Sequence, residues 1–279
     1  MSINTTTTRI HSTAVIAEGA QIDPTAEIGP YAVIGPNVKI GGGTKIGAHA
    51  IIDGHTTIGK DCKIYAGASI GLEPQDFRYK GEPTGVILGD RVTIREYVTI
   101  HRATVEGFTE IGDDSFLMNY VHIAHNCKLG KGVILANSVM MAGHVNIGDN
   151  VVMSGMCILH QHVRVGRLAM LSGMTGTRSD LPPFTTCDGR PAMVRGVNVI
   201  GLRRAGAGQT VRTAVKEAYR LLYRSGLNVT QALAKIEEDI EQFPEIQEIV
   251  AFFKSSKRGC AGIAIPGAEL MDEFPSDDI

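Results

Sequence analysis

Two histidines stand three residues apart in the stretch NYVHIAHNCKLG, and an asparagine directly follows the second. His122 and His125 could be metal ligands or an acid and base pair, because imidazole binds zinc and titrates at about pH 6.5. They could also be ordinary surface residues. The backbone that carries them must decide between these roles.

A six-residue repeat runs through the first two thirds of the chain. Isoleucine occupies every sixth position from Ile10 to Ile70, and the spacing returns at Leu88–Ile100 and Ile111–Leu171. A small residue follows most of these aliphatic residues by four positions. A helix has a period of about 3.6 and a simple strand a period of 2, so neither explains six. The repeat predicts a parallel β-helix, in which three hexads form one triangular coil.

We therefore expect a β-helix over residues 1–190, with 24 complete hexads, and a small α-helical domain over 191–279. The repeat breaks at residues 72–87 and 106–110, which are predicted to be extruded loops on one face, often the binding face of a solenoid. Three helices are predicted, at residues 209–226, 229–240 and 244–259. Residues 261–279 are expected to be poorly ordered or to need docking for order.

Composition narrows the possible functions. A net charge of −2 does not provide the basic footprint of a nucleic-acid-binding protein. The opening lacks the features of a signal peptide, and no run reaches the roughly 20 apolar residues of a membrane span, so we expect no stable membrane insertion. The odd number of cysteines argues against a disulfide framework and favours a cytoplasmic protein. Cys62, Cys127 and Cys157 fall in the inward small-residue column and are predicted to be structural.

Residues 18 positions apart lie above one another in such a solenoid, which places His125, Gly143 and Gln161 in one column. His122, His144 and His160 flank this column on the outside of the coil. A histidine could act there as a general base, and the bare glycine leaves a backbone N–H open to an oxyanion. A zinc site and a non-catalytic scaffold remain alternatives. His11, His49 and His55 stand apart from the strip and are predicted to be solvated.

On these residues the chain resembles the UDP-N-acetylglucosamine O-acyltransferases of lipid A biosynthesis. The resemblance covers nearly the whole chain and includes QDFRYKGEPT, IREYVTIHR, HIAHNC, MAGH, HQ at 160–161, GVNVIGLRR and AYRLLYRSG. It implies a left-handed parallel β-helix, a homotrimer with active sites between subunits, and no cofactor or metal. It also implies transfer of a 3-hydroxyacyl chain from acyl carrier protein to the glucosamine 3-hydroxyl of UDP-N-acetylglucosamine. A related UDP-3-O-acylglucosamine N-acyltransferase shares IAHN but has a different N-terminal domain.

The resemblance also implies roles for single residues. His125 would be the general base and the Gly143 N–H the oxyanion donor. Gly173 falls where the family sets acyl-chain length, and a glycine there leaves room for a longer chain. The substrate-binding residues would be Asp76, Arg78, His122, His144, His160, Gln161, Asn198 and Arg204.

Two residues of the chain depart from the family's pattern. Arg78 stands where the family has lysine, and Asn126 stands where it commonly has aspartate. A carboxylate at 126 would stabilise the imidazolium of His125, so we expect Asn126→Asp to leave activity unchanged or raise it.

One face of the helix predicted at residues 209–226 is basic, and this face could be solvated or could dock the acidic carrier protein. Its members are Arg212, Lys216, Arg220 and Arg224.

Overall fold

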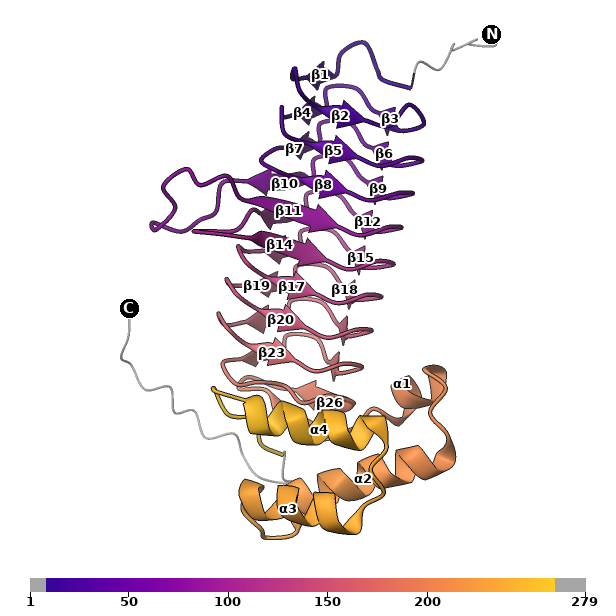
Figure 1. Cartoon of the computed structure of the whole chain (residues 1–279), viewed down its shortest axis with the longest axis vertical. Helices are drawn as coiled ribbons and strands as arrows, with labels where there is room; N and C mark the ends of the chain where they lie inside the picture. Colours follow the sequence, from indigo (N-terminus) through magenta and orange to yellow (C-terminus); the bar gives the residue numbers. More distant parts are fainter. Residues whose placement is uncertain (1–8, 264–279) are drawn as a thin grey trace.

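The computed structural model describes residues 9–263, and each hexad forms one short strand of a triangular solenoid (Figure 1). Successive strands from β1 to β25 fall in the first, second and third parallel sheet in turn, so that each strand pairs with the strand three further along the chain. Partners within an uninterrupted coil are 18 residues apart, as in Val15 with Val33. This arrangement is the predicted parallel β-helix.

The strands are short because a corner follows every two or three residues. The first sheet contains β1 (Val15–Ile16), β4 (Val33–Ile34), β7 (Ile51–Ile52), β10 (Ser69–Leu72), β13 (Thr99–His101), β16 (His122–Ile123), β19 (Met140–Met141), β22 (Ile158–Leu159) and β25 (Gly176–Thr177). The second contains β2 (Gln21–Ile22), β5 (Lys39–Ile40), β8 (Thr57–Ile58), β11 (Gly85–Leu88), β14 (Phe108–Ile111), β17 (Lys128–Leu129), β20 (Asn146–Ile147) and β23 (Arg164–Val165). The third contains β3 (Glu27–Ile28), β6 (Lys45–Ile46), β9 (Lys63–Ile64), β12 (Thr93–Ile94), β15 (Phe116–Leu117), β18 (Ile134–Leu135), β21 (Val152–Met153), β24 (Met170–Leu171), β26 (Thr185–Asp188) and β27 (Met193–Val197).

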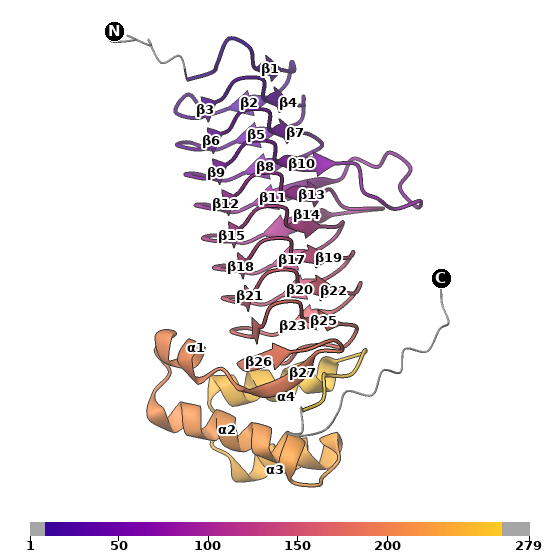
Figure 2. The ribbon, with the colours of Figure 1, turned by 180° about the vertical axis from the view of Figure 1, so that it is seen from behind.

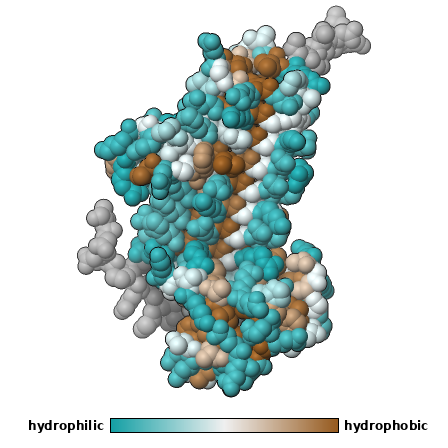
Figure 3. Space-filling model, viewed as in Figure 1, coloured by the Kyte–Doolittle hydropathy of each residue, from teal (hydrophilic) through white to brown (hydrophobic). Residues whose placement is uncertain are grey.

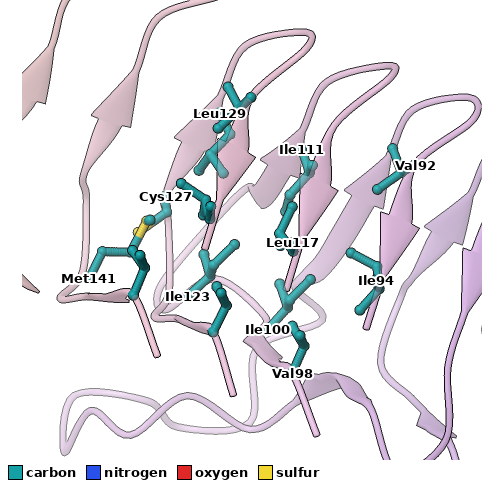
Figure 4. Packing of buried hydrophobic residues seen from close by; sticks show 14 of the residues in the cluster. Val92, Ile94, Val98, Ile100, Ile111, Leu117, Ile123, Cys127, Leu129 and Met141 are labelled. Atoms are coloured by element: carbon teal, nitrogen blue, oxygen red, sulfur yellow. The ribbon is translucent and has the colours of Figure 1, made fainter. Parts of the chain in front are cut away.

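The aliphatic and small columns of the repeat form the core inside the coils. Ile94, Ile100 and Ile123 are fully buried, and Figure 4 shows them pointing into the interior with residues from neighbouring coils. Cys127 lies in the same stack with 0% exposure. The three cysteines predicted to be inward are therefore core residues, because Cys62 and Cys157 are equally buried.

The corners need left-handed backbone even where the residue is not glycine. In the corner between the first and second sheets, Asn126, His144 and His162 have φ angles of 57°, 61° and 63° and lie in successive coils. Asparagine tolerates this conformation better than most residues. The solenoid therefore fixes the direction in which these three side chains leave the coil.

Two insertions leave the coil on the same side (Figure 1). Their effect is visible in the pairing, because Ser69 pairs with Thr99 and Thr99 with His122, at separations larger than 18. The strands beside the insertions are longer than predicted. Residues 108–110, expected in the second loop, lie in β14 and pair with residues 85–87 of β11. These extra strand residues satisfy backbone groups that a looser loop would leave to water.

The third sheet continues past residue 190, since β27 pairs antiparallel with β26 up to Val197. Four helices follow beneath the solenoid (Figure 2): α1 (Val199–Arg204), α2 (Gln209–Arg224), α3 (Val229–Asp239) and α4 (Pro244–Ser255). The last three begin where the sequence predicts, and α1 was not predicted. Ala261 and Ile263 dock by backbone contacts to Asp180 and Val194, whereas 264–279, the rest of the predicted tail, lies outside the described residues.

The outer surface of the solenoid is mixed in polarity. On the face in Figure 3, a hydrophobic stripe runs along the long axis between hydrophilic columns. No helix in the described part of the chain has the length and apolar character needed to cross a membrane.

Candidate active site

His125 leaves the coil at the corner after β16 and points away from the core, yet only 8% of it is exposed. The first extruded loop covers it, because Asp76 Oδ2 lies 3.4 Å from His125 Nε2. His144 packs edge-on against the same ring, with the ring centroids 5.1 Å apart. The imidazole is therefore held in a partly closed site rather than on an open surface.

The Nδ1 side of His125 faces Asn126. The distance from Nδ1 to Asn126 Oδ1 is 2.9 Å. Because an amide oxygen only accepts hydrogen bonds, this contact places the proton on Nδ1. The lone pair of the neutral ring is then on Nε2, the nitrogen that faces Asp76.

Asp76 is itself paired with Arg78. The guanidinium donates to both carboxylate oxygens, from Nη2 to Oδ2 at 2.7 Å and from Nε to Oδ1 and Oδ2 at 3.1 Å each. The Arg78 guanidinium holds the pKa of Asp76 well below its usual range. The carboxylate beside His125 is therefore charged at neutral pH, and Arg78 binds it as a bidentate partner.

Gly143 lies directly above His125 in the next coil. A Cβ built on Gly143 would be 2.4 Å from His125 Cε1 and 2.5 Å from Nε2, so only glycine fits against the ring in this position. Gly143 is buried, and among the described residues its N–H donates to no partner. A buried N–H beside a histidine lone pair is the arrangement that an oxyanion site requires.

Four further histidines surround this pair. His144 stacks on His162 with centroids 4.7 Å apart, and His101 contacts His122 edge-on at 5.3 Å. Burial lowers the pKa values of His101 and His122, and burial with the neighbouring His162 and His125 lowers that of His144. These rings are therefore neutral at pH 7 and can offer hydrogen bonds but no charge.

His122 and His160 lie on the first-sheet side of the corner. His122 Nδ1 is 2.7 Å from Thr99 Oγ1, and His160 Nδ1 is 3.1 Å from Nη2 of Arg258, which follows α4. Gln161 is exposed in the coil beyond Gly143. The predicted strip is thus present, and the chain segment after α4 reaches its far end.

A groove of about 730 Å³ opens beside the histidines. Thr104 is 3% exposed, and its hydroxyl is the buried side-chain polar atom without a partner within residues 9–263. An unpaired buried hydroxyl is typical of a surface that a ligand completes. The groove is lined by Arg78, Thr104, Val105, Glu106, Gly107, Phe108, Glu110, Asn126, Lys128, His144, Asn146 and His162.

Asn198 and Arg204 are not part of this cluster in one chain. Asn198 caps α1, accepting from the Gly201 N–H at 2.9 Å and donating to the Leu168 carbonyl at 2.8 Å. Helix α1, which ends at the exposed Arg204, lies across the long axis from the extruded loops (Figures 1 and 2). Gly173 is exposed in the corner between the third and first sheets.

Comparison with known proteins shows the family to which the chain belongs. A family model described as UDP N-acetylglucosamine O-acyltransferase, domain 2, matches residues 180–261, and one described as bacterial transferase hexapeptide (six repeats) matches 37–71 and 108–143. An acyl-acyl-carrier-protein–UDP-N-acetylglucosamine O-acyltransferase from Thermodesulfovibrio yellowstonii is 47% identical over 252 residues, covering 90% of this chain and 98% of the relative. The chain belongs to the UDP-N-acetylglucosamine O-acyltransferase family.

Solved structures of the family have the same fold. The enzyme from Moraxella catarrhalis is 42% identical, with a TM-score of 0.88 over 91% of this chain and 99% of that one. The enzyme from Bacteroides fragilis is 40% identical, with a TM-score of 0.87 over 90% of this chain and 98% of that one. The predicted left-handed parallel β-helix with a helical C-terminal region is confirmed, and the chain is an acyltransferase.

Sequence reasoning missed three residues that contact the histidine strip: Thr99, His101 and His162. His162 is 18 residues after His144, so the coil arithmetic that gave Gly143 would also have found it. Thr99 and His101 lie one coil before β16, but the second insertion changes the separation to 23 residues, as between Thr99 and His122. If the residues of the insertion are added to the 18-residue coil, the spacing places Thr99 and His101 beside His122.

The zinc alternative would need at least three side chains that converge on one ion. Within residues 9–263, no three His, Cys, Asp or Glu side chains converge as metal ligands would. His125 and His122 leave different parts of the coil, since His122 is in β16 and His125 in the corner after it.

Proposed function

We propose that this acyltransferase moves a 3-hydroxyacyl chain from acyl carrier protein to the 3-hydroxyl of the glucosamine in UDP-N-acetylglucosamine, with His125 as general base. This would be the first step of lipid A biosynthesis. The observation that carries the base assignment is the contact of His125 Nδ1 with Asn126 Oδ1, which leaves the lone pair on Nε2, next to Asp76 and the Gly143 backbone. The name of the Thermodesulfovibrio relative supports the donor and the acceptor.

The reaction follows from these positions. His125 Nε2 takes the proton of the sugar hydroxyl while the hydroxyl oxygen bonds to the thioester carbonyl carbon. The carbonyl oxygen becomes an oxyanion, which the Gly143 N–H stabilises. Collapse of this intermediate breaks the carbon–sulfur bond, and the imidazolium returns the proton to the leaving thiolate. Asp76, charged and 3.4 Å from Nε2, favours the imidazolium while it exists.

The remaining residues of the strip hold the acceptor in this proposal. His122, His144, His160 and Gln161 position the sugar and its acetamide, and the neutral rings suit a neutral sugar. Arg78 lines the groove beside His144. Asn198 and Arg204 bind the nucleotide and its phosphates, for which a guanidinium is well shaped.

A homotrimer would bring the two groups of residues together. Within one chain α1 lies across the long axis from the extruded loops (Figure 2), and the first of these loops contacts His125, so a neighbouring copy must supply one of the two groups. Apolar side chains on the first and third sheets and on the corner between them offer a contact surface. They include Ile134, Met140, Met156 and Met174, which are 37%, 43%, 57% and 68% exposed.

Co-expression of two inactive variants tests the shared site. His125→Ala and Arg204→Ala should each be inactive alone, whereas random trimers of both should regain about a quarter of wild-type activity, because one site in four would combine intact residues from two copies. Differently tagged chains allow the mixed trimers to be purified. No recovery in purified mixed trimers would place both residues of a site in the same chain.

Helix α2 is the proposed docking surface for acyl carrier protein. Arg220 pairs with Glu217 at 2.7 Å, so its charge is partly compensated. Lys216 and Arg224 line a groove of about 270 Å³ with Tyr219 and Tyr223 and form no ion pair within residues 9–263. Such a surface complements an acidic partner. With a carrier-protein donor, and with five free thiols within residues 9–263, the cytoplasm is the proposed location.

The function is tested with purified protein, UDP-N-acetylglucosamine and 3-hydroxyacyl carrier proteins of graded chain length. We expect an acylated nucleotide sugar and one free thiol per turnover. A parallel series with the 3-amino sugar identifies the acceptor, and stoichiometric zinc in chelator-washed protein would favour a metal-dependent enzyme instead. The preferred chain length tests the role of Gly173, where an added Cβ would meet only the Gly155 carbonyl oxygen, at 3.6 Å.

A further inference from the structure

We propose that Asn126 is a positioning residue that must be an amide, and that Asp76 rather than residue 126 supplies the charge opposite the His125 imidazolium. The inference rests on the proposed function, since it concerns the same base. It revises the expectation that an aspartate at 126 would be neutral or beneficial. The reason lies in what both ends of the Asn126 side chain contact.

Backbone groups fix the orientation of the Asn126 amide. Oδ1 accepts a hydrogen bond from the Thr104 N–H at 2.9 Å, and Nδ2 donates one to the Glu106 carbonyl at 3.1 Å. An N–H can only donate and a carbonyl can only accept. A reversed amide would therefore place Nδ2 against the Thr104 N–H and Oδ1 against the Glu106 carbonyl, and both hydrogen bonds would be lost. The oxygen that these contacts orient is the one that holds His125 Nδ1.

The same amide ties the second insertion to the site. Thr104 and Glu106 belong to the segment between β13 and β14, and they line the groove with Asn126 itself. The backbone N–H of Asn126 also donates to Thr109 Oγ1 at 2.9 Å. One side chain therefore sets the tautomer of the base and the position of the neighbouring groove wall.

An aspartate would preserve only half of these contacts. One carboxylate oxygen could still accept from Thr104 and His125, but the other would face the Glu106 carbonyl without a hydrogen atom between them. Two acceptors in contact repel, and the lost donor leaves the carbonyl unpaired. The backbone is not the obstacle, because aspartate tolerates the left-handed φ of 57° at this corner nearly as well as asparagine.

Charge compensation for the imidazolium comes from the opposite nitrogen. Asp76 Oδ2 is 3.4 Å from Nε2, and Arg78 keeps that carboxylate ionised. A carboxylate at 126 would put a second negative charge beside the imidazole, on the side where this chain has a neutral acceptor. In this chain a neutral partner on one nitrogen is matched with a charged partner on the other.

The test compares pH profiles of wild type, Asn126→Asp, Asp76→Asn and the control Asn150→Asp. Asn150 has the same left-handed corner conformation, with φ of 56°, and its side chain is exposed outside the groove. We expect Asn126→Asp to lower kcat about tenfold and to move the acid limb of kcat/KM up by about one pH unit. Asp76→Asn should move that limb down, and Asn150→Asp should change neither.

The outcomes separate the alternatives. If Asn126→Asp keeps kcat within twofold of wild type, the requirement for an amide is refuted. If Asp76→Asn leaves the acid limb in place, the charge does not come from Asp76. A loss of folded protein without movement of the acid limb would indicate a structural role only. Failure of the wild type to acylate the sugar would refute the proposed function instead.

Discussion

Replacing His125 with alanine is expected to lower kcat by about 10²–10⁴-fold, the range that a positioned general base contributes. His125 is the histidine of the strip whose Nδ1 is held by an amide oxygen and whose Nε2 lies against both a carboxylate and the Gly143 backbone. The change removes the base but keeps the groove. The measurement is the steady-state rate with a 3-hydroxyacyl carrier protein at saturating sugar, with KM determined separately.

The matched control is His11→Ala. His11 is exposed in the first coil, and within residues 9–263 the hydrogen bonds of its ring are to Thr13, so its loss should leave kcat and KM unchanged. A His125→Ala enzyme that keeps more than about a tenth of wild-type kcat would contradict the base assignment. A large rise in KM with an unchanged kcat would assign His125 to binding.

Most of the fold could be predicted because a solenoid repeats one local rule. Each hexad needs an aliphatic residue and a small residue inside, and these residues recur at the same positions in almost every coil from Ile16 to Leu171. Helix α1 was missed because it has only six residues, too few for a period to be visible. Strand β27 was missed because it pairs antiparallel and has no place in the hexad rhythm.

The candidate site was predictable only where residues in successive coils are 18 positions apart. The register alone placed Gly143 above His125, and the contact between them agrees with it. The contact of Asp76 with His125 could not be derived from spacing, because a twelve-residue loop (73–84) can fold in many ways and only its packing decides which side chain reaches the ring. The Nδ2 contact of Asn126 was hidden for the same reason, since its partner Glu106 is in the other insertion.

Replacing Gly143 with alanine is expected to lower kcat about 100-fold, because displacing a reacting group by about 1 Å can cost that much. The new Cβ would stand 2.4 Å from His125 Cε1 and 2.5 Å from Nε2, so the imidazole must move. It cannot move freely, because Asn126 holds Nδ1 and His144 packs against the ring. The backbone N–H of residue 143 is retained, so the loss would report the position of the base.

The control for this change is Gly208→Ala. An added Cβ there meets nothing within 4 Å, and the φ of −66° suits alanine. It should leave kcat within twofold of wild type. Thermal unfolding of both variants separates activity from stability, with a loss of about 1–3 kcal/mol expected for Gly143→Ala from overpacking. If Gly143→Ala remains fully active, the ring has room to shift, and the close approach of Gly143 to His125 is not what positions the base.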